Sequence, residues 1–151
     1  MADCASFVDP PNQVRIGSQA DAAFLRSVVN EIGRLDVVLD DGSHIASHQR
    51  ASFRALFPLL SDGGLYIIED THTSYWPHME GGFRRRGSAI EFAKTIVDDM
   101  HGWYHNRQGE VVQKDQVASV SFYDSIVVIE KRAHPHPVHI KMGTASRPTA
   151  P

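Results

Sequence analysis

Apolar residues recur along the chain at helical spacing in some segments and in short unbroken runs in others, which predicts helices and strands in turn. Helices are predicted at residues 17–33, 45–60 and 88–100. Strands are predicted at residues 13–16, 35–40 and 64–70, with two more in 117–131 joined by a tight turn. Asp21 is placed to cap the first helix, and Pro58 is expected to bend or end the second.

The predicted order β-α-β-α-β-α-β-β is typical of an α/β fold. The runs at 35–40 and 64–70 are apolar almost throughout, as expected for strands covered on both faces. We therefore expect a mostly parallel sheet with helices on both faces. The tight turn near residue 124 forces antiparallel pairing, so the terminal hairpin is expected to add an antiparallel edge strand.

The composition of the chain argues against several classes of protein. A chain of 151 residues suits one domain, and its net charge of −3 gives no electrostatic reason to expect nucleic acid or an anionic membrane as partner. No run approaches the roughly 20 apolar residues of a membrane span, and the first residues lack a secretory signal, so a cytoplasmic location is expected. The single cysteine, Cys4, excludes an internal disulfide and a cysteine-based metal cluster.

Two segments are not expected to contribute residues to a functional site. The basic run "FRRRG" at 83–87 is interpreted as a solvated loop. Residues 133–151 are rich in proline and histidine and are interpreted as a flexible tail, which leaves residues 1–132 as the folded domain.

Two strands end in adjacent acids: Asp40 and Asp41 after the run at 35–40, Glu69 and Asp70 after the run at 64–70. Parallel strands end at one edge of a sheet, where ligands bind, and neighbouring strands are roughly 5 Å apart. Carboxylates so close repel one another, and a hard divalent ion such as Mg²⁺ would relieve this. Because side chains alternate along a strand, Asp40 and Asp41 are not expected to face the same site.

A structural role for these acids remains equally open. Acids after strands often cap the following helix, and Asp41 or Ser43 is placed to cap the helix predicted from Ile45.

His44 lies three residues after Asp41, where its unperturbed pKa near 6.5 suits proton removal at neutral pH. It is also an ordinary polar residue for a first helical turn. His48, one turn further on, is expected to face the same side and is a weaker candidate for the base. His44 and His48 also have a spacing found in zinc sites, but the glutamate of the zinc-protease motif is absent. Tyr75 and Trp76 follow in a glycine-containing loop, where they either line a substrate pocket or close the core.

The segment "DVVLDDGSHIASHQRASFRALFPLLSDGGLYIIEDTHTSYWP" closely resembles the S-adenosylmethionine-dependent O-methyltransferases of macrolide biosynthesis, of the mycinamicin and tylosin (demethylmacrocin) type. The resemblance runs from about residue 7 to 131, weakens between 84 and 116, and includes "FYDSIVVIEK", which is similar to the terminal hairpin of class I methyltransferases. It implies a Rossmann-like class I methyltransferase sheet. It also implies methyl transfer from S-adenosylmethionine to a sugar hydroxyl of a macrolide-like natural product, a small-molecule acceptor.

The resemblance also implies roles for individual residues. Asp41, Glu69 and Asp70 would hold Mg²⁺, and His44 would take the proton from the hydroxyl that is methylated. The adenosine part of the cofactor would be bordered by Gln19, Asp21 and Asp40. Apart from the resemblance, Tyr75 and Trp76 remain the candidates for contact with the acceptor.

The chain departs from the family pattern at its start. The glycine-rich loop that binds the methionine and ribose parts of S-adenosylmethionine is absent, so the resemblance implies an N-terminally truncated domain. The predicted strand at 35–40 would then have an unpaired side, and a homo-oligomer is expected to cover it. The alternative function is a non-catalytic remnant that self-associates and binds at most a metal or an acceptor, and whether the chain is an enzyme stays open.

Overall fold

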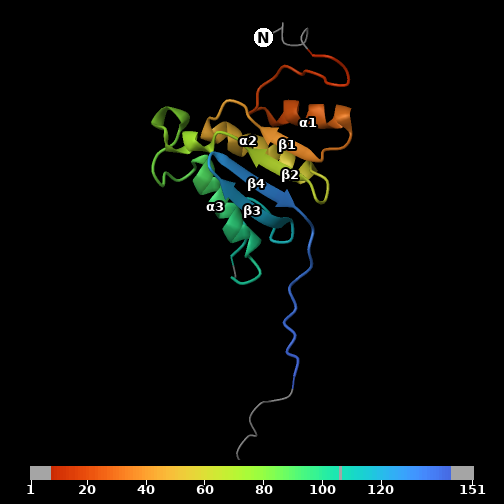
Figure 1. The fold of residues 1–151 in the computed structure, drawn as a ribbon, viewed down its shortest axis with the longest axis vertical. Helices are drawn as coiled ribbons and strands as arrows, with labels where there is room; N and C mark the ends of the chain where they lie inside the picture. Colours follow the sequence, from red (N-terminus) through yellow and green to blue (C-terminus); the bar gives the residue numbers. More distant parts are fainter. Residues whose placement is uncertain (1–7, 106, 144–151) are drawn as a thin grey trace, which may run out of the picture.

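A computed structural model describes residues 8–105 and 107–143 (Figure 1). The described helices are α1 (Ala22–Ile32), α2 (Ala46–Leu56) and α3 (Ala89–Met100), with three short 3₁₀ helices η2 (Phe57–Leu59), η3 (Thr71–Tyr75) and η4 (Pro77–Met79). The strands are β1 (Val37–Asp40), β2 (Leu65–Ile68), β3 (Val117–Tyr123) and β4 (Ile126–Lys131).

The three helices confirm the predictions made from apolar spacing. Asp21 accepts hydrogen bonds from the backbone N–H groups of Ala23 and Phe24 and so caps α1, and Gly33 ends this helix with φ at 80°. Pro58 lies in η2, where the end of α2 tightens into a 3₁₀ turn.

The strand predicted at 13–16 is wrong, because these residues lie outside regular secondary structure. Arg15 instead reaches α1, where its Nε is 2.7 Å from a carboxylate oxygen of Glu31. A strand needs a partner for its backbone groups, and no neighbouring strand among the described residues offers one here.

The four strands form one mixed sheet in the order β1-β2-β4-β3. β1 and β2 are parallel, and β4 is antiparallel to both β2 and β3. Three of the four strands therefore run in one direction, which confirms the α/β class with a terminal hairpin. The antiparallel strand was expected at the edge, and this is corrected by the structure: β4 inserts between β2 and β3, so β3 is the edge strand.

The described helices cover one face of the sheet, not both as the sequence predicted. α2 contacts α1 and α3, and burial alternates along β1, with Val38 and Asp40 buried while Val37 and Leu39 are more than half exposed. Successive crossovers that move along the sheet in the same direction place their helices on the same side. β1 is also the other edge strand, and its outer side is unpaired within the described residues.

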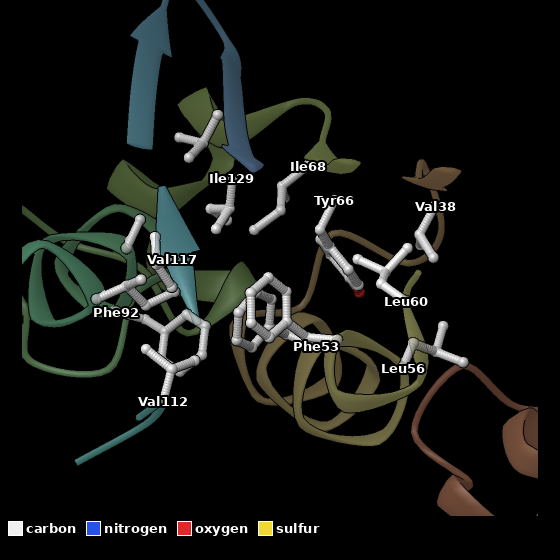
Figure 2. Close-up of a cluster of buried hydrophobic side chains, with 14 of the residues drawn as sticks. Val38, Phe53, Leu56, Leu60, Tyr66, Ile68, Phe92, Val112, Val117 and Ile129 are labelled. Carbon is white, nitrogen blue, oxygen red and sulfur yellow. The ribbon is translucent and has the colours of Figure 1, made fainter. Parts of the chain in front are cut away.

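The core lies between the sheet and its three helices (Figure 2). Phe53 of α2 is at its centre, with its ring stacked on Phe57 at 4.6 Å between centroids and in edge contact with Tyr66 and Phe92. These rings tie α2 to β2 and α3, and their burial supplies much of the hydrophobic stabilisation of the fold.

The segment after β4 runs away from the body of the domain as an extended chain (Figure 1). Its first part is anchored, because the N–H of His134 donates to the carbonyl of Asp115 and the ring of His136 packs on Trp103. Val138 and Ile140 are largely exposed. Flexibility of residues 133–151 stays a prediction, and residues 144–151 lie outside the described part. No helix in the described residues is long and apolar enough to cross a membrane.

Candidate metal and catalytic site

The carboxyl ends of β1 and β2 bring two acids and one imidazole together. Nε2 of His44 lies 3.8 Å from Oδ1 of Asp41 and 3.7 Å from Oδ2 of Asp70. One ligand atom from each of the three residues lies within 4.8 Å of the others. The parallel pairing of β1 with β2 causes this, because it places residues 41 and 70 just beyond neighbouring strand ends.

Unusual backbone conformations at His44 and Asp70 orient these side chains toward one another. His44 and Asp70 both adopt left-handed conformations, with φ at 57° and 52°. The turn after Asp70 is fixed by Thr73, whose N–H and Oγ1 both donate to the Asp70 carbonyl, and by the N–H of Thr71, which donates to the carbonyl of Ser125. These hydrogen bonds hold Asp70 toward His44 even though the left-handed conformation is costly for both residues.

Neither Asp41 nor Ser43 caps α2. The helix starts at Ala46 with no side-chain cap hydrogen bond from Ile45, the residue before it. The backbone N–H and Oγ of Ser47 donate instead to the two carboxylate oxygens of Glu80, at 2.9 and 3.0 Å. These hydrogen bonds lower the pKa of Glu80. Because a residue from a distant loop satisfies the start of α2, the capping interpretation of Asp41 is wrong.

Asp40 is buried, whereas the side chain of Asp41, just beyond the end of β1, is about half exposed. Asp40 is 5% exposed, and its Oδ2 accepts a 2.8 Å hydrogen bond from the hydroxyl of Tyr66. The Tyr66 hydroxyl also shares a 2.6 Å hydrogen bond with Ser52 of α2. Burial raises the pKa of Asp40, since removal from water disfavours its charged form.

Gln19 links the chain before α1 to the turn after β1. Its amide N–H donates to Oδ1 of Asp40, and its Oε1 accepts from the backbone N–H of Ser43 at 2.8 Å. Gly42 makes this possible, because a Cβ at that position would lie 2.4 Å from Oε1 of Gln19. A larger residue at position 42 would force the Gln19 side chain to move and would disturb these hydrogen bonds.

A cavity of about 280 Å³ lies beside β1, with Gln19, Asp40 and Asp41 in its wall. Two of the three residues predicted to border the cofactor therefore face one cavity. Asp21 is not in its lining and serves as the cap of α1. Their roles toward a cofactor stay predictions.

Glu69 lies outside the cluster of three. Its backbone N–H donates to the carbonyl of Asp40 and so extends the β1–β2 pairing by one bond, and the residue is half-buried. Its side chain is not among the ligand groups that come within 4.8 Å of one another. A role for Glu69 as a metal ligand stays a prediction.

The loop after β2 adds a histidine that the sequence reasoning missed. Nδ1 of His72 lies 3.8 Å from Oδ1 of Asp70 and 2.6 Å from the hydroxyl of Ser125. Its position two residues after Asp70 was the available signal.

The aromatic residues of this loop form an exposed surface next to the cluster. Trp76 is 42% exposed and packs between the rings of His72 and His78, and Tyr75 is 50% exposed. Side chains so exposed do not close the core, so the structural alternative for Tyr75 and Trp76 is wrong. Contact with an acceptor stays a prediction for both.

The parallel strands β1 and β2 end at an acidic cluster, and the antiparallel strand β4 is inserted in the same sheet. This arrangement defines a Rossmann-like α/β domain with its site at the strand ends. The chain is 32% identical to the MycE methyltransferase from the mycinamycin biosynthetic pathway, solved in complex with Mg and SAH. The two structures superpose with a TM-score of 0.79 over 85% of this chain and 35% of MycE. No protein-family model matches the chain.

Curated relatives point the same way. The chain is 38% identical to the 8-demethyl-8-alpha-L-rhamnosyl tetracenomycin-C 2'-O-methyltransferase of Streptomyces olivaceus, over 89% of this chain and 36% of that protein. It is 36% identical to the mycinamicin VI 2''-O-methyltransferase of Micromonospora griseorubida, over 76% of this chain and 30% of that protein. The chain is therefore homologous to one segment of proteins that are named as sugar O-methyltransferases. It spans about a third of the length of the relatives it matches.

Proposed function

We propose that the chain supplies the metal- and acceptor-binding part of an enzyme that transfers a methyl group from S-adenosylmethionine to a sugar hydroxyl of a macrolide-like natural product. The observation that carries the proposal is the convergence of Asp41, His44 and Asp70 at the ends of two parallel strands. The relatives that share this segment are named as sugar O-methyltransferases, and MycE was solved with Mg and SAH.

The carboxylates of Asp41 and Asp70 fit a divalent cation. Both are about half exposed, and within the described residues neither lies within 4.0 Å of a lysine or arginine nitrogen. Ligand oxygens on opposite sides of Mg²⁺ are about 4 Å apart, so a spread of up to 4.8 Å between ligand atoms needs only small side-chain rotations. Glu69 is proposed as a further ligand that would have to turn toward the other two.

Asp41 and Asp70 would hold Mg²⁺, which supplies positive charge that lowers the pKa of a sugar hydroxyl. His44 would accept the hydroxyl proton at Nε2, the ring nitrogen that faces both carboxylates. Its other nitrogen, Nδ1, is buried and has no hydrogen-bond partner in the described part of the chain, so it offers no route for the proton. Asp40 and Gln19 would border the cofactor, and Tyr75 and Trp76 would contact the acceptor from the exposed side of the loop.

A magnesium titration monitored by thermal unfolding tests the proposal. At ten times the dissociation constant, Mg²⁺ should raise the free energy of unfolding by about 1.4 kcal/mol, which raises Tm by about 3–6 °C for a chain of this size. The shift should vanish in Asp41→Asn and persist in the matched control Asp98→Asn, an exposed acid of α3. Asp41→Asn retaining the full shift would refute the metal site.

His44→Ala separates the two roles open to the imidazole. If His44 is a base and not a ligand, this variant keeps the magnesium shift and loses methyl transfer. Loss of the shift in His44→Ala would mean that the imidazole binds the metal, a donor more typical of zinc or nickel than of magnesium.

The second candidate function is a non-catalytic domain that self-associates and binds at most a metal or an acceptor. The exposure of Val37 (55%) and Leu39 (56%) on the unpaired edge strand β1 favours it, because a second copy could cover them. Calorimetry with S-adenosylmethionine separates the two functions. Micromolar binding by this chain supports the methyltransferase, whereas no heat at millimolar cofactor together with a dimer in sedimentation supports the second.

A further inference from the structure

Four arginines surround a cavity of about 360 Å³ on the helical side of the domain. Arg50 and Arg54 come from α2, one turn apart, and Arg84 and Arg86 come from the loop before α3. Residues 83–86 are exposed, as expected for a solvated loop. The same loop also lines the cavity together with Arg50 and Arg54, which lie thirty or more positions earlier in the sequence.

The positive charge around this cavity is not balanced. None of the four guanidinium groups is within 4.0 Å of a carboxylate oxygen in residues 8–105 and 107–143. Two acids also line the cavity, but Glu91 already pairs with Lys94 at 2.6 Å, and Glu110 is exposed. Four cations with two acids in a concave wall leave a local excess of positive charge, in a chain whose overall charge is −3.

Two of the guanidinium groups are held in place before any ligand arrives. Arg50 donates from Nη1 to the carbonyl of Gly87, and Gly87 has φ at 89°, a conformation that suits glycine. The guanidinium of Arg54 lies 5.4 Å from the centre of the Phe92 ring, which is 5% exposed and forms an apolar part of the wall. A guanidinium over an aromatic face can still donate from its N–H groups to a ligand.

We propose that this arginine cavity binds the phosphate group of a small phosphorylated molecule. Planar guanidinium groups match phosphate oxygens in pairs, and several converging on one cavity are typical of phosphate recognition. The volume lies at the low end of the range for small-molecule pockets, which suits a diphosphate group or a compact phosphorylated compound. Asp41, His44 and Asp70 do not line the cavity, so the site is separate from the metal cluster.

Inorganic pyrophosphate is the probe that tests this site. Calorimetry is done without divalent cations and at constant ionic strength, so that neither the metal cluster nor general screening contributes. The variant is the double substitution Arg84→Gln/Arg86→Gln, since both side chains are exposed and their loss leaves the core intact. The matched control is Arg26→Gln/Arg34→Gln, which removes the same charge from exposed positions outside the cavity.

Pyrophosphate should bind the unmodified chain and the control with equal affinity, and the cavity variant at least about tenfold more weakly, since a hydrogen bond to a charged group contributes about 1.5–3 kcal/mol. A parallel titration with adenosine diphosphate separates two sources of the same chemistry. Equal affinity for both probes assigns the site to the diphosphate group alone, and tighter binding of the nucleotide assigns it to a phosphorylated organic molecule. No binding at millimolar pyrophosphate, or equal loss in the variant and the control, would overturn the proposal.

Discussion

The buried hydrogen bond between Tyr66 and Asp40 makes a prediction that depends on pH. The substitution is Tyr66→Phe, which removes only the hydroxyl and leaves the ring packed against Phe53. The parent hydroxyl donates to Asp40 at 2.8 Å and shares a hydrogen bond with Ser52 at 2.6 Å, and Tyr66 is fully buried. Water cannot replace these contacts without opening the core.

The cost follows from the two bonds that are lost. A hydrogen bond to an ionised carboxylate contributes about 1.5–3 kcal/mol and one between neutral groups about 0.5–1.5 kcal/mol, so Tyr66→Phe should lower the free energy of unfolding by about 2–4 kcal/mol near neutral pH. Once Asp40 is protonated, both lost bonds are neutral, and the cost should fall by about 1–2 kcal/mol.

The sign of the pH dependence follows from the raised pKa of Asp40. Burial holds the pKa of Asp40 above its ordinary value of 3.8, so the folded chain binds more protons than the unfolded chain between the two values. The contribution of Asp40 to stability is therefore largest below the unfolded pKa and is lost as the pH rises through the folded pKa. Tyr66 is among the groups that lower the pKa of Asp40, so removing its hydroxyl raises that pKa further and extends the loss to higher pH.

Urea unfolding measures this effect at about pH 4 and at about pH 8, with the midpoint converted to a free energy through a common m-value. Tyr66→Phe should cost more at the higher pH. The same substitution in an Asp40→Asn background should cost the same at both, and Tyr75→Phe, at a half-exposed position, should change stability by less than about 0.5 kcal/mol. If Tyr66→Phe costs the same at both pH values in the parent background, Asp40 is not ionised beside Tyr66 and the reasoning fails.

Two further predictions concern the loops that frame the cluster. Glu80→Gln should destabilise the chain by about 1 kcal/mol, as expected for weakening a helix cap, while Glu110→Gln should not. Because hydrogen bonds to Ser47 lower the pKa of Glu80, its stabilisation is present above the unfolded pKa of 4.5 and is lost as the pH falls through the folded pKa, which a stability profile against pH measures. At position 44, where φ is 57°, the glycine variant should be about 1 kcal/mol more stable than the alanine variant in urea unfolding, and equal stability would argue against a left-handed His44.

The sequence predicted best those features that depend on near neighbours. The start and end of α1 follow from Asp21 and Gly33, which act within a few residues of themselves. The burial of Asp40 next to an exposed Asp41 agrees with strand alternation. The approach of Asp70 to Asp41 needed one more step, the rule that parallel strands end at one edge of a sheet.

The features that the sequence could not predict depend on distant partners. A four-residue apolar run at 13–16 is a strand only if another strand pairs with it. β4 lies inside the sheet because it pairs with both β2 and β3. The apolar pattern predicts that a segment is a strand, but it does not predict which strands are neighbours. Glu80 accepts the hydrogen bond of the Ser47 N–H at the start of α2 from thirty-three positions away, where the sequence had suggested a cap by Asp41 or Ser43.

The backbone conformations at the cluster argue for a role beyond stability. Among the described residues other than glycine, five have positive φ, and two of them, His44 and Asp70, belong to the three-residue cluster. A left-handed conformation costs a residue with a side chain about 1 kcal/mol, and glycine at either position would remove that cost. Stability alone would therefore favour glycine at both positions.

The side chains gain no strong contact in return, since their nearest approach, from Nε2 of His44 to Oδ2 of Asp70, is 3.7 Å. The two costly conformations bring an imidazole and a carboxylate close together without forming a hydrogen bond. This arrangement is expected where a third group binds between them.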